Sequence, residues 1–159
     1  MWEIKKVLVP IDLSDTESTS NTFPFAQSLA EEFGAELYVI YVYQIPTLID
    51  LLSAPLAFLK SKEELAEGAR VAAEERLSSF LDKTSSPTIN PQGLIRPGTP
   101  YEEILQVAQE LTIDLIVIGT RALKGIDHLL LGSTAERVVR MASCPVITIK
   151  PKNFRFVMP

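Results

Sequence analysis

The order of apolar runs and amphipathic segments predicts a chain in which strands and helices alternate. Short runs that are almost wholly apolar and rich in β-branched residues are typical of parallel strands covered on both faces. Such runs occupy residues 7–9, 37–42, 115–118 and 146–149, and Gly93-Leu94-Ile95 is a weaker candidate. The sequence therefore predicts five strands.

Between these runs, apolar residues recur at the spacing of a helix that buries one face. Gly34 follows the first such segment, at a position where glycine commonly closes a helix. In this first helix the residues expected to be buried are Phe23, Ala26, Leu29, Ala30 and Phe33. The second helix, from about Glu63 to Leu81, is expected to bury Ala66, Ala69, Ala73, Leu77 and Phe80.

Two later helices carry capping signals at their starts. Thr99-Pro100-Tyr101-Glu102 combines a capping threonine, a proline at the first helical position and a glutamate placed to complete a capping box. Ser133-Thr134-Ala135-Glu136 offers a second capping box, which predicts that Ser133 caps the last helix. The residues expected to be buried are Ile104, Val107, Ala108 and Leu111 in one helix and Ala135, Val138, Val139 and Ala142 in the other.

Strands that alternate with helices imply right-handed crossovers and a doubly wound parallel α/β sheet with helices on both faces. In such folds ligands bind beyond the carboxyl ends of the strands, where the winding reverses. The strand ends to inspect follow Val9, Val42, Ile95 and Ile118. The chain of 159 residues suits one substantial core, so we expect one domain over residues 1–159.

The charge of the chain argues against nucleic-acid binding. Fifteen basic and twenty acidic residues give a net charge of −5, which repels phosphate backbones. The apolar segment 45–59 is interrupted by two prolines and an aspartate, and it is shorter than the roughly 20 residues of a membrane helix. With one cysteine, Cys144, and no signal-peptide pattern, the sequence predicts a cytoplasmic protein without a membrane partner.

Glycines lie at two places where a bound phosphate would be favoured. Gly119 follows the fourth expected strand, and Gly132-Ser133 stands at the start of the last helix. Glycine lets the backbone approach a ligand closely, and a helix N-terminus presents free amides at the positive end of its dipole. On these grounds alone the alternative stays open that Gly119 only turns the chain and Ser133 only caps its helix.

The spacing of these residues resembles the universal stress protein family. That family carries Gly-x-x-Gly, nine residues and then Gly-Ser or Gly-Thr, and here Gly119-Thr120-Arg121-Ala122 is followed, after nine residues, by Gly132-Ser133. Residues 7–14 resemble the family's first strand and its acidic end, residues 96–100 its turn before the third helix, and residues 143–146 its entry to the last strand. The resemblance implies an adenine-nucleotide alpha-hydrolase-like fold with strand order 3-2-1-4-5.

The same resemblance implies a site for ATP or AMP, with or without Mg²⁺. Pro10 and Asp12 would lie beside the nucleoside, the Val42 backbone would contact adenine, and the residues around the glycines would hold ribose and phosphates. At Ala122 the ATP-binding branch of the family has glycine, and a methyl group there costs about 1 kcal/mol or more if the position needs a positive φ. The implied site residues are Pro10, Asp12, Val42, Ile118, Gly119, Ala122, Gly132, Ser133 and Thr134.

Several polar residues keep a structural alternative. Asp12 follows a strand, where aspartate commonly caps the next turn, and Ser14 or Asp15 would share that task. Arg121 and Lys124 fit a solvated loop better than a phosphate site, and we assign no chemistry to His128, the single histidine.

Other nucleotide and phosphate folds do not fit this sequence. A bacterial receiver domain needs a phosphate-accepting aspartate after the third strand, where this chain has Ile95-Arg96-Pro97. The glycine-rich loops of dinucleotide-binding enzymes and of P-loop NTPases do not occur in the sequence. Because Asp12 is the single candidate acid or base beside the phosphates, we expect at most slow ATP hydrolysis.

A second hypothesis is a scaffold protein of the same fold that binds no nucleotide. Some members of the resembled family lack the glycine motif, and Ala122 moves this chain part of the way towards them. The last strand would be an edge that needs cover, and the resemblance implies a homodimer paired along it. The apolar tail after Phe154 would extend that interface, and segment 45–59 would close over the nucleotide or dock a partner.

Overall fold

The computed structural model describes residues 3–46, 61–84, 86–120 and 131–152. The strands are β1 (Lys6–Ile11), β2 (Glu36–Tyr43), β3 (Gln92–Pro97), β4 (Leu115–Gly119) and β5 (Val146–Ile149). The helices are α1 (Thr16–Phe33), α3 (Lys62–Thr84), α4 (Pro100–Glu110) and α5 (Ser133–Met141). All five strands are parallel and form one sheet in the order β3-β2-β1-β4-β5, which confirms the expected doubly wound α/β fold.

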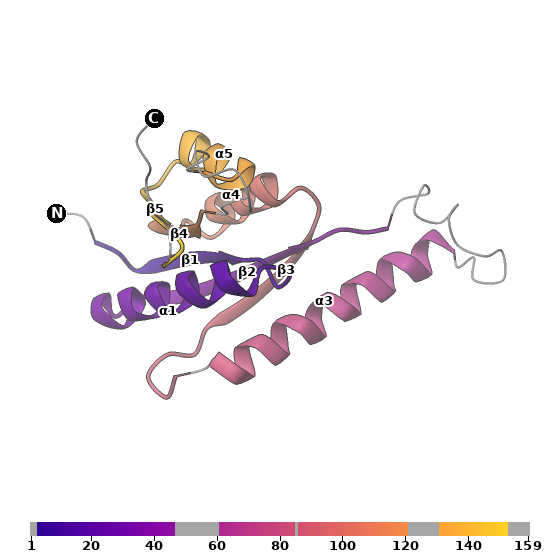
Figure 1. The fold of residues 1–159 in the computed structure, drawn as a ribbon, viewed down its shortest axis with the longest axis horizontal. Helices are drawn as coiled ribbons and strands as arrows, with labels where there is room; N and C mark the ends of the chain where they lie inside the picture. Colours follow the sequence, from indigo (N-terminus) through magenta and orange to yellow (C-terminus); the bar gives the residue numbers. More distant parts are fainter. Residues whose placement is uncertain (1–2, 47–60, 85, 121–130, 153–159) are drawn as a thin grey trace.

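Helices cover both faces of the sheet. Figure 1 shows α1 and α3 on one face and α4 and α5 on the other. Because side chains alternate along each strand, two separate cores result. The core on the α1 face includes Val7, Val9, Val39, Val117 and Phe23. The core on the other face includes Leu8, Ile40, Ile116, Ile104 and Val138. None of the helices in the described ranges combines the length and the apolar character that a membrane span requires.

Helix α1 ends at the glycine that its sequence predicts. The Asp15 side chain accepts a hydrogen bond from Ser18 N at 3.1 Å, which caps the first turn, and Gly34 closes the helix with φ +62°. Phe23, Ala26 and Ala30 are buried. The prediction for Phe33 is wrong: its side chain is 50 % exposed. It is the last residue of α1, so the following turn, which would have extended the buried face, is missing.

Helix α3 is longer than the strands it covers. Its 23 residues span about 35 Å, whereas a six-residue strand such as β3 spans about 20 Å. Only Ala73 and Leu77 are buried, and Phe80 packs partly against the same core. The expected burial of Ala66 and Ala69 is therefore only partial, because the first half of the helix extends past the sheet (Figure 1).

Helices α4 and α5 bury the expected centres of their apolar faces without the predicted capping boxes. Thr99 and Pro100 occupy the N-cap and first helical position, but Thr99 makes no side-chain capping bond. The Glu102 carboxylate instead accepts a hydrogen bond from the Tyr101 hydroxyl at 2.7 Å. In α5, Val139 is 44 % exposed, so its predicted burial is wrong. It follows the fully buried Val138, whose side chain takes the place facing the sheet.

The ladder between β1 and β4 stops early. β1 pairs with β2 through Ile11↔Tyr41, but with β4 only at Val7↔Leu115 and Leu8↔Ile116. Asp114 N donates to Lys6 O at 3.0 Å, so alternate residues of β1 from Lys6 onward direct their backbone groups towards β4. Pro10 is the next such position after Leu8, and it has no N–H to donate. The two strands therefore part at Pro10.

The opposite ends of the same strands are tied together. The Asp114 carboxylate accepts hydrogen bonds from both Lys5 N and Lys6 N at 2.9 Å, and the Lys6 ammonium donates to Leu111 O at 3.0 Å. These contacts hold the start of β1 beside the start of β4. The sheet is thus closed at the amino ends of its central strands and open at their carboxyl ends.

Two glycine substitutions test the backbone argument with one chemical change. Gly34→Ala should lower the free energy of unfolding by about 1–2 kcal/mol, because φ +62° is strained for alanine. Gly68→Ala, within exposed α3, should raise it by about 0.5–1 kcal/mol, because alanine favours the helix. An added Cβ meets nothing within 4 Å at either site, so urea denaturation isolates the conformational effect. Equal effects at both positions would contradict the assignment of Gly34 as a left-handed cap.

Candidate ligand-binding site

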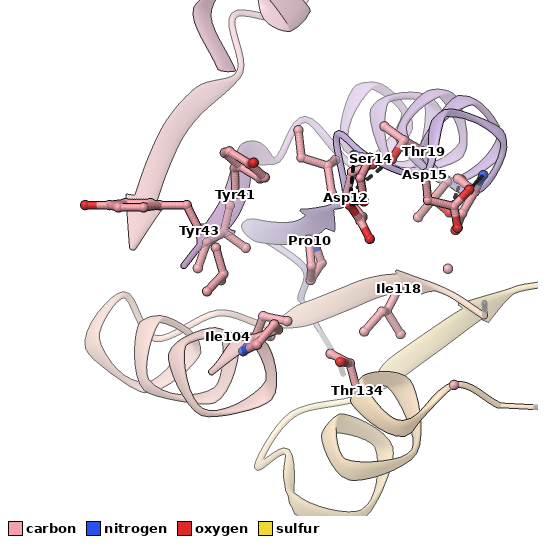
Figure 2. Close-up of a pocket in the computed structure, with 18 of the residues that line it drawn as sticks. Pro10, Asp12, Ser14, Asp15, Thr19, Tyr41, Tyr43, Ile104, Ile118 and Thr134 are labelled. Atoms are coloured by element: carbon pink, nitrogen blue, oxygen red, sulfur yellow. Dashed lines mark hydrogen bonds between the residues drawn. The ribbon is translucent and has the colours of Figure 1, made fainter. Parts of the chain in front are cut away.

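A cavity of about 420 Å³ lies where β1 and β4 part. It is bounded by the carboxyl ends of β1, β2 and β4 and by the starts of α1, α4 and α5, as Figure 2 shows. Its volume is within the range of small-molecule sites. Eight of the nine residues predicted from the sequence line it: Pro10, Asp12, Val42, Ile118, Gly119, Gly132, Ser133 and Thr134.

The remaining predictions for this region lie outside the described residues. These are Ala122, the loop cations Arg121 and Lys124, and His128. Most of segment 45–59 and the tail after Phe154 also lie outside them.

One wall of the cavity is apolar. Pro10, Val42 and Ile118 meet Ile104 of α4 there, and Ile104 and Ile118 are otherwise part of the buried core. The sequence analysis predicted Ile104 as a core residue and missed its place at the site. The signal was present, because Ile104 stands in the first turns of a helix that follows a strand end. Such a wall suits a flat apolar group.

The opposite wall carries hydroxyl groups from the start of α1. Ser14, Ser18, Thr19 and Thr22 line it together with the two carboxylates of Asp12 and Asp15. The sequence analysis missed the residues beyond Asp15. Ser18 and Thr22 are four residues apart in α1, so their hydroxyl side chains lie on one helical face, and this spacing is the signal that would have found them. Ser14 lies in the turn before the helix.

Asp12 is held in a tight turn at the end of β1. Its Oδ1 accepts hydrogen bonds from Ser14 N at 2.9 Å and from the Ser14 hydroxyl at 2.5 Å, the geometry of an Asx turn. The helix cap is supplied by Asp15 instead. The expectation that Asp12 shares the turn with Ser14 and Asp15 is thus confirmed, and its carboxylate also reaches the cavity wall (Figure 2).

Gly119 is required for close packing rather than for a turn. Its φ is not positive, unlike those of Gly34 and Gly98. A Cβ on Gly119 would lie 2.3 Å from Ser18 Oγ and 2.7 Å from Thr22 Oγ1, so these two hydroxyl groups of α1 would have to move to admit a side chain. The alternative that Gly119 merely turns the chain is therefore wrong. The glycine lets the hydroxyl face of α1 approach the end of β4.

Thr120, the residue after Gly119, joins β4 to β5. Its amide and its hydroxyl both donate to Ile149 O, at 2.8 and 3.2 Å, and its side chain is buried. Thr120 is not among the residues that line the cavity. Its role in the described structure is to fasten the ends of the two strands together.

The first turn of α5 faces the cavity without a side-chain cap. Gly132, not Ser133, is the N-cap residue, and no side-chain capping bond is made there. The predicted capping box is therefore wrong, because the helix starts one residue earlier and a glycine has no side chain to offer. Ser133 and Thr134 form the first turn, where amide groups favour an anion. Figure 2 shows Thr134 across the cavity from Asp12.

The titratable groups of the described residues offer little for metal or acid–base chemistry. No group of three or more histidine, cysteine, aspartate or glutamate side chains converges among them. Cys144 lies half-buried beside the α5 core, and burial raises the pKa of its thiol.

Comparison with known proteins agrees with this geometry. A model of the universal stress protein family matches residues 3–150. A universal stress protein of Methanocaldococcus jannaschii is 33 % identical over 150 residues, covering 94 % of this chain and 84 % of that protein. The structure of the universal stress protein UspA from Lactobacillus plantarum is 25 % identical, covers 91 % of this chain and 97 % of its own, and has a TM-score of 0.69.

A further solved structure, of a universal stress protein in complex with cAMP, shares the fold. Its TM-score is 0.60 at 19 % identity, and the match covers 94 % of this chain and 98 % of that one. The family match extends over nearly the whole chain, and the relative in Methanocaldococcus jannaschii matches over most of its own length. The chain therefore belongs to the universal stress protein family.

Proposed function

We propose that the cavity binds an adenine nucleotide, ATP or AMP, and that its occupancy serves as a signal in a cytoplasmic stress response. One observation carries the proposal: a single cavity joins an apolar wall to the uncapped first turn of α5. A nucleotide needs both features, a surface for the base and amides for the phosphates. The cAMP complex of a family member supports this class of ligand.

The base would lie against the apolar wall. Glu36 N donates to Lys5 O, so the backbone groups of Glu36 point towards β1. Alternate residues of a strand point to the same neighbour, so the backbone groups of Val42, six residues later, also point towards β1. β1 ends at Ile11, opposite Tyr41, and its ladder does not reach Val42 O. In this proposal the Val42 carbonyl would accept a hydrogen bond from the adenine amino group, and Asp12 would accept one from ribose.

The phosphates would lie at Gly132, Ser133 and Thr134. The amides of this turn and the two hydroxyls supply donors, and the helix dipole favours negative charge at this end. Asp12 and Asp15 are the carboxylates that line the described cavity, and no group of three or more histidine, cysteine, aspartate or glutamate side chains that could hold a metal ion converges among the described residues. The proposed activity is binding, with at most slow hydrolysis.

Charge at Thr134 tests the phosphate position. Thr134→Glu should weaken ATP binding at least tenfold, because its carboxylate would compete with phosphate at the amides of the same turn. A glutamate in the first turn favours the helix, so the melting temperature should not fall. Thr134→Gln, of the same length but neutral, should bind ATP within a few-fold of the unchanged protein. Isothermal titration calorimetry measures the ATP affinity of the unchanged protein and of both variants. Equal affinity of the Glu and Gln variants would mean that the phosphates lie elsewhere.

The departure from the family motif gives a second test. If position 122 approaches phosphate with its backbone, Ala122→Gly should tighten ATP binding several-fold, because the methyl group no longer opposes the approach. The same titration measures this gain. An unchanged affinity would show that the third glycine of the motif is not needed in this chain.

A dimeric scaffold is the alternative function, and one observation favours it. β5 is an edge strand with a single neighbour, and Val139 and Met141 of the adjoining α5 are 44 % and 60 % exposed. An uncovered edge and apolar side chains beside it are the usual sites of association. We propose that a second copy of the chain covers them, with or without nucleotide.

A proline in β5 tests this pairing. Thr120 N donates to Ile149 O and Ile116 N to Pro145 O, so the odd residues of β5 face β4 and Thr148 faces the open edge. Thr148→Pro removes an outward N–H and keeps the ladder to β4, so the dimer should dissociate. Thr148→Val keeps the N–H and should remain dimeric. Sedimentation velocity at about 100 μM decides, and a monomeric unchanged protein would refute the pairing.

A further inference from the structure

Thr19 is the most deeply buried polar side chain in contact with the Asp12 turn. It lies in the second turn of α1, its side chain is 5 % exposed, and it lines the cavity wall behind Asp12 (Figure 2). The Thr19 hydroxyl donates to Asp12 O at 2.8 Å, and Thr19 Oγ1 accepts a hydrogen bond from Asp12 N at 3.3 Å. One side chain thus contacts both peptide groups of the residue expected to bind ribose.

The two hydrogen bonds are chemically compatible. A threonine hydroxyl has one proton to donate and lone pairs to accept, so it can bond a carbonyl and an amide at once. Thr19 itself is fixed, because its amide donates to Asp15 O at 3.2 Å and Asp15 caps α1. These hydrogen bonds therefore fix the Asp12 backbone relative to α1.

The rest of the turn extends the same constraint to the carboxylate. Asp15 N donates to Asp12 O at 3.0 Å, which gives that carbonyl a second donor, and Ser14 bonds the carboxylate from its amide and its hydroxyl. Thr19 holds the backbone and Ser14 holds the side chain. A ligand that meets Asp12 would then find it already oriented, which avoids an ordering cost on binding.

We infer that Thr19 is a positioning residue for nucleotide binding, acting through Asp12 and not through contact with the ligand. The inference rests on the proposed function, because it assigns Asp12 to the bound nucleoside. Loss of the hydroxyl removes one hydrogen-bond partner from each of two half-buried peptide groups of Asp12, so the turn relaxes and the carboxylate loses its place. The α1 hydroxyls are then not equivalent: Thr19 supports the site from behind.

Paired substitutions at position 19 test the hydroxyl itself. Thr19→Val keeps the shape of the side chain and removes the hydroxyl, and it should weaken ATP binding about tenfold. Thr19→Ser keeps the hydroxyl and should bind ATP within about twofold of the unchanged protein. Ile113→Val removes a buried methyl group at the opposite end of β4 and should lower the melting temperature without changing affinity. Equal affinity of the Val and Ser variants would overturn the inference.

A double-mutant cycle shows whether Thr19 acts through Asp12. In an Asp12→Ala background, Thr19→Val should have little further effect on ATP affinity, because the residue it positions no longer bears a carboxylate. A full and additive loss would mean that Thr19 acts by another route and would overturn the inference. All affinities are measured by calorimetry well below the melting temperature of each variant.

Hydrogen exchange separates failure of this inference from failure of the proposed function. If the unchanged protein binds no ATP, the proposed function fails, and the ligand-free protein still decides the role of Thr19. The Asp12 amide should then exchange at least tenfold faster in Thr19→Val than in Thr19→Ser. Equal exchange in the two variants would show that the hydroxyl does not hold the turn.

Discussion

Pro10 has no amide hydrogen, and it stands at a position of β1 whose backbone faces β4. Because Lys6, Leu8 and Pro10 alternate towards that neighbour, the missing donor ends the β1–β4 ladder after Leu8 while the ladder to β2 continues to Ile11. A proline is normally excluded from a central strand. Here it occurs where a doubly wound sheet reverses its winding, so the gap it creates is the cavity and not a defect in the core.

The two walls of that cavity depend on different constraints. The apolar wall is a continuation of the core, since Ile104 and Ile118 serve both. The polar wall depends on Gly119, because a side chain there would displace the hydroxyl groups of Ser18 and Thr22. A glycine that the sequence analysis noted as part of a phosphate motif therefore also leaves room for the hydroxyl face of α1.

The elements and the position of the cavity were predictable from the sequence because they follow from local patterns. Apolar runs predicted the strands, and the glycine spacing pointed to the strand ends. Capping was less predictable: Ser133 looked like an N-cap, but only the path of the chain decides whether Gly132 or Ser133 takes the last non-helical position. The predicted burial of Phe33 and Val139 was wrong for a related reason. Periodicity does not show where a helix ends or which of two adjacent residues faces the sheet.

In the sequence the hydroxyl wall is visible as a polar stretch before Phe23, in which Ser18 and Thr22 are four residues apart. Its function depends on contacts across a turn, such as that between Thr19 and Asp12, which no spacing rule specifies. Which group each hydroxyl bonds depends on how the turn packs against the helix in three dimensions. The sequence analysis identified Asp12 but could not identify the Thr19 hydroxyl that bonds its backbone.

Thr120 gives the cavity a mechanical connection to the edge of the sheet. Gly119 borders the cavity, and the next residue is bonded twice to Ile149 O, the last carbonyl of β5. One of these hydrogen bonds comes from the Thr120 amide and the other from its hydroxyl. The cavity border and the edge strand β5 are thus joined through a single residue, one strand spacing or about 4.8 Å apart.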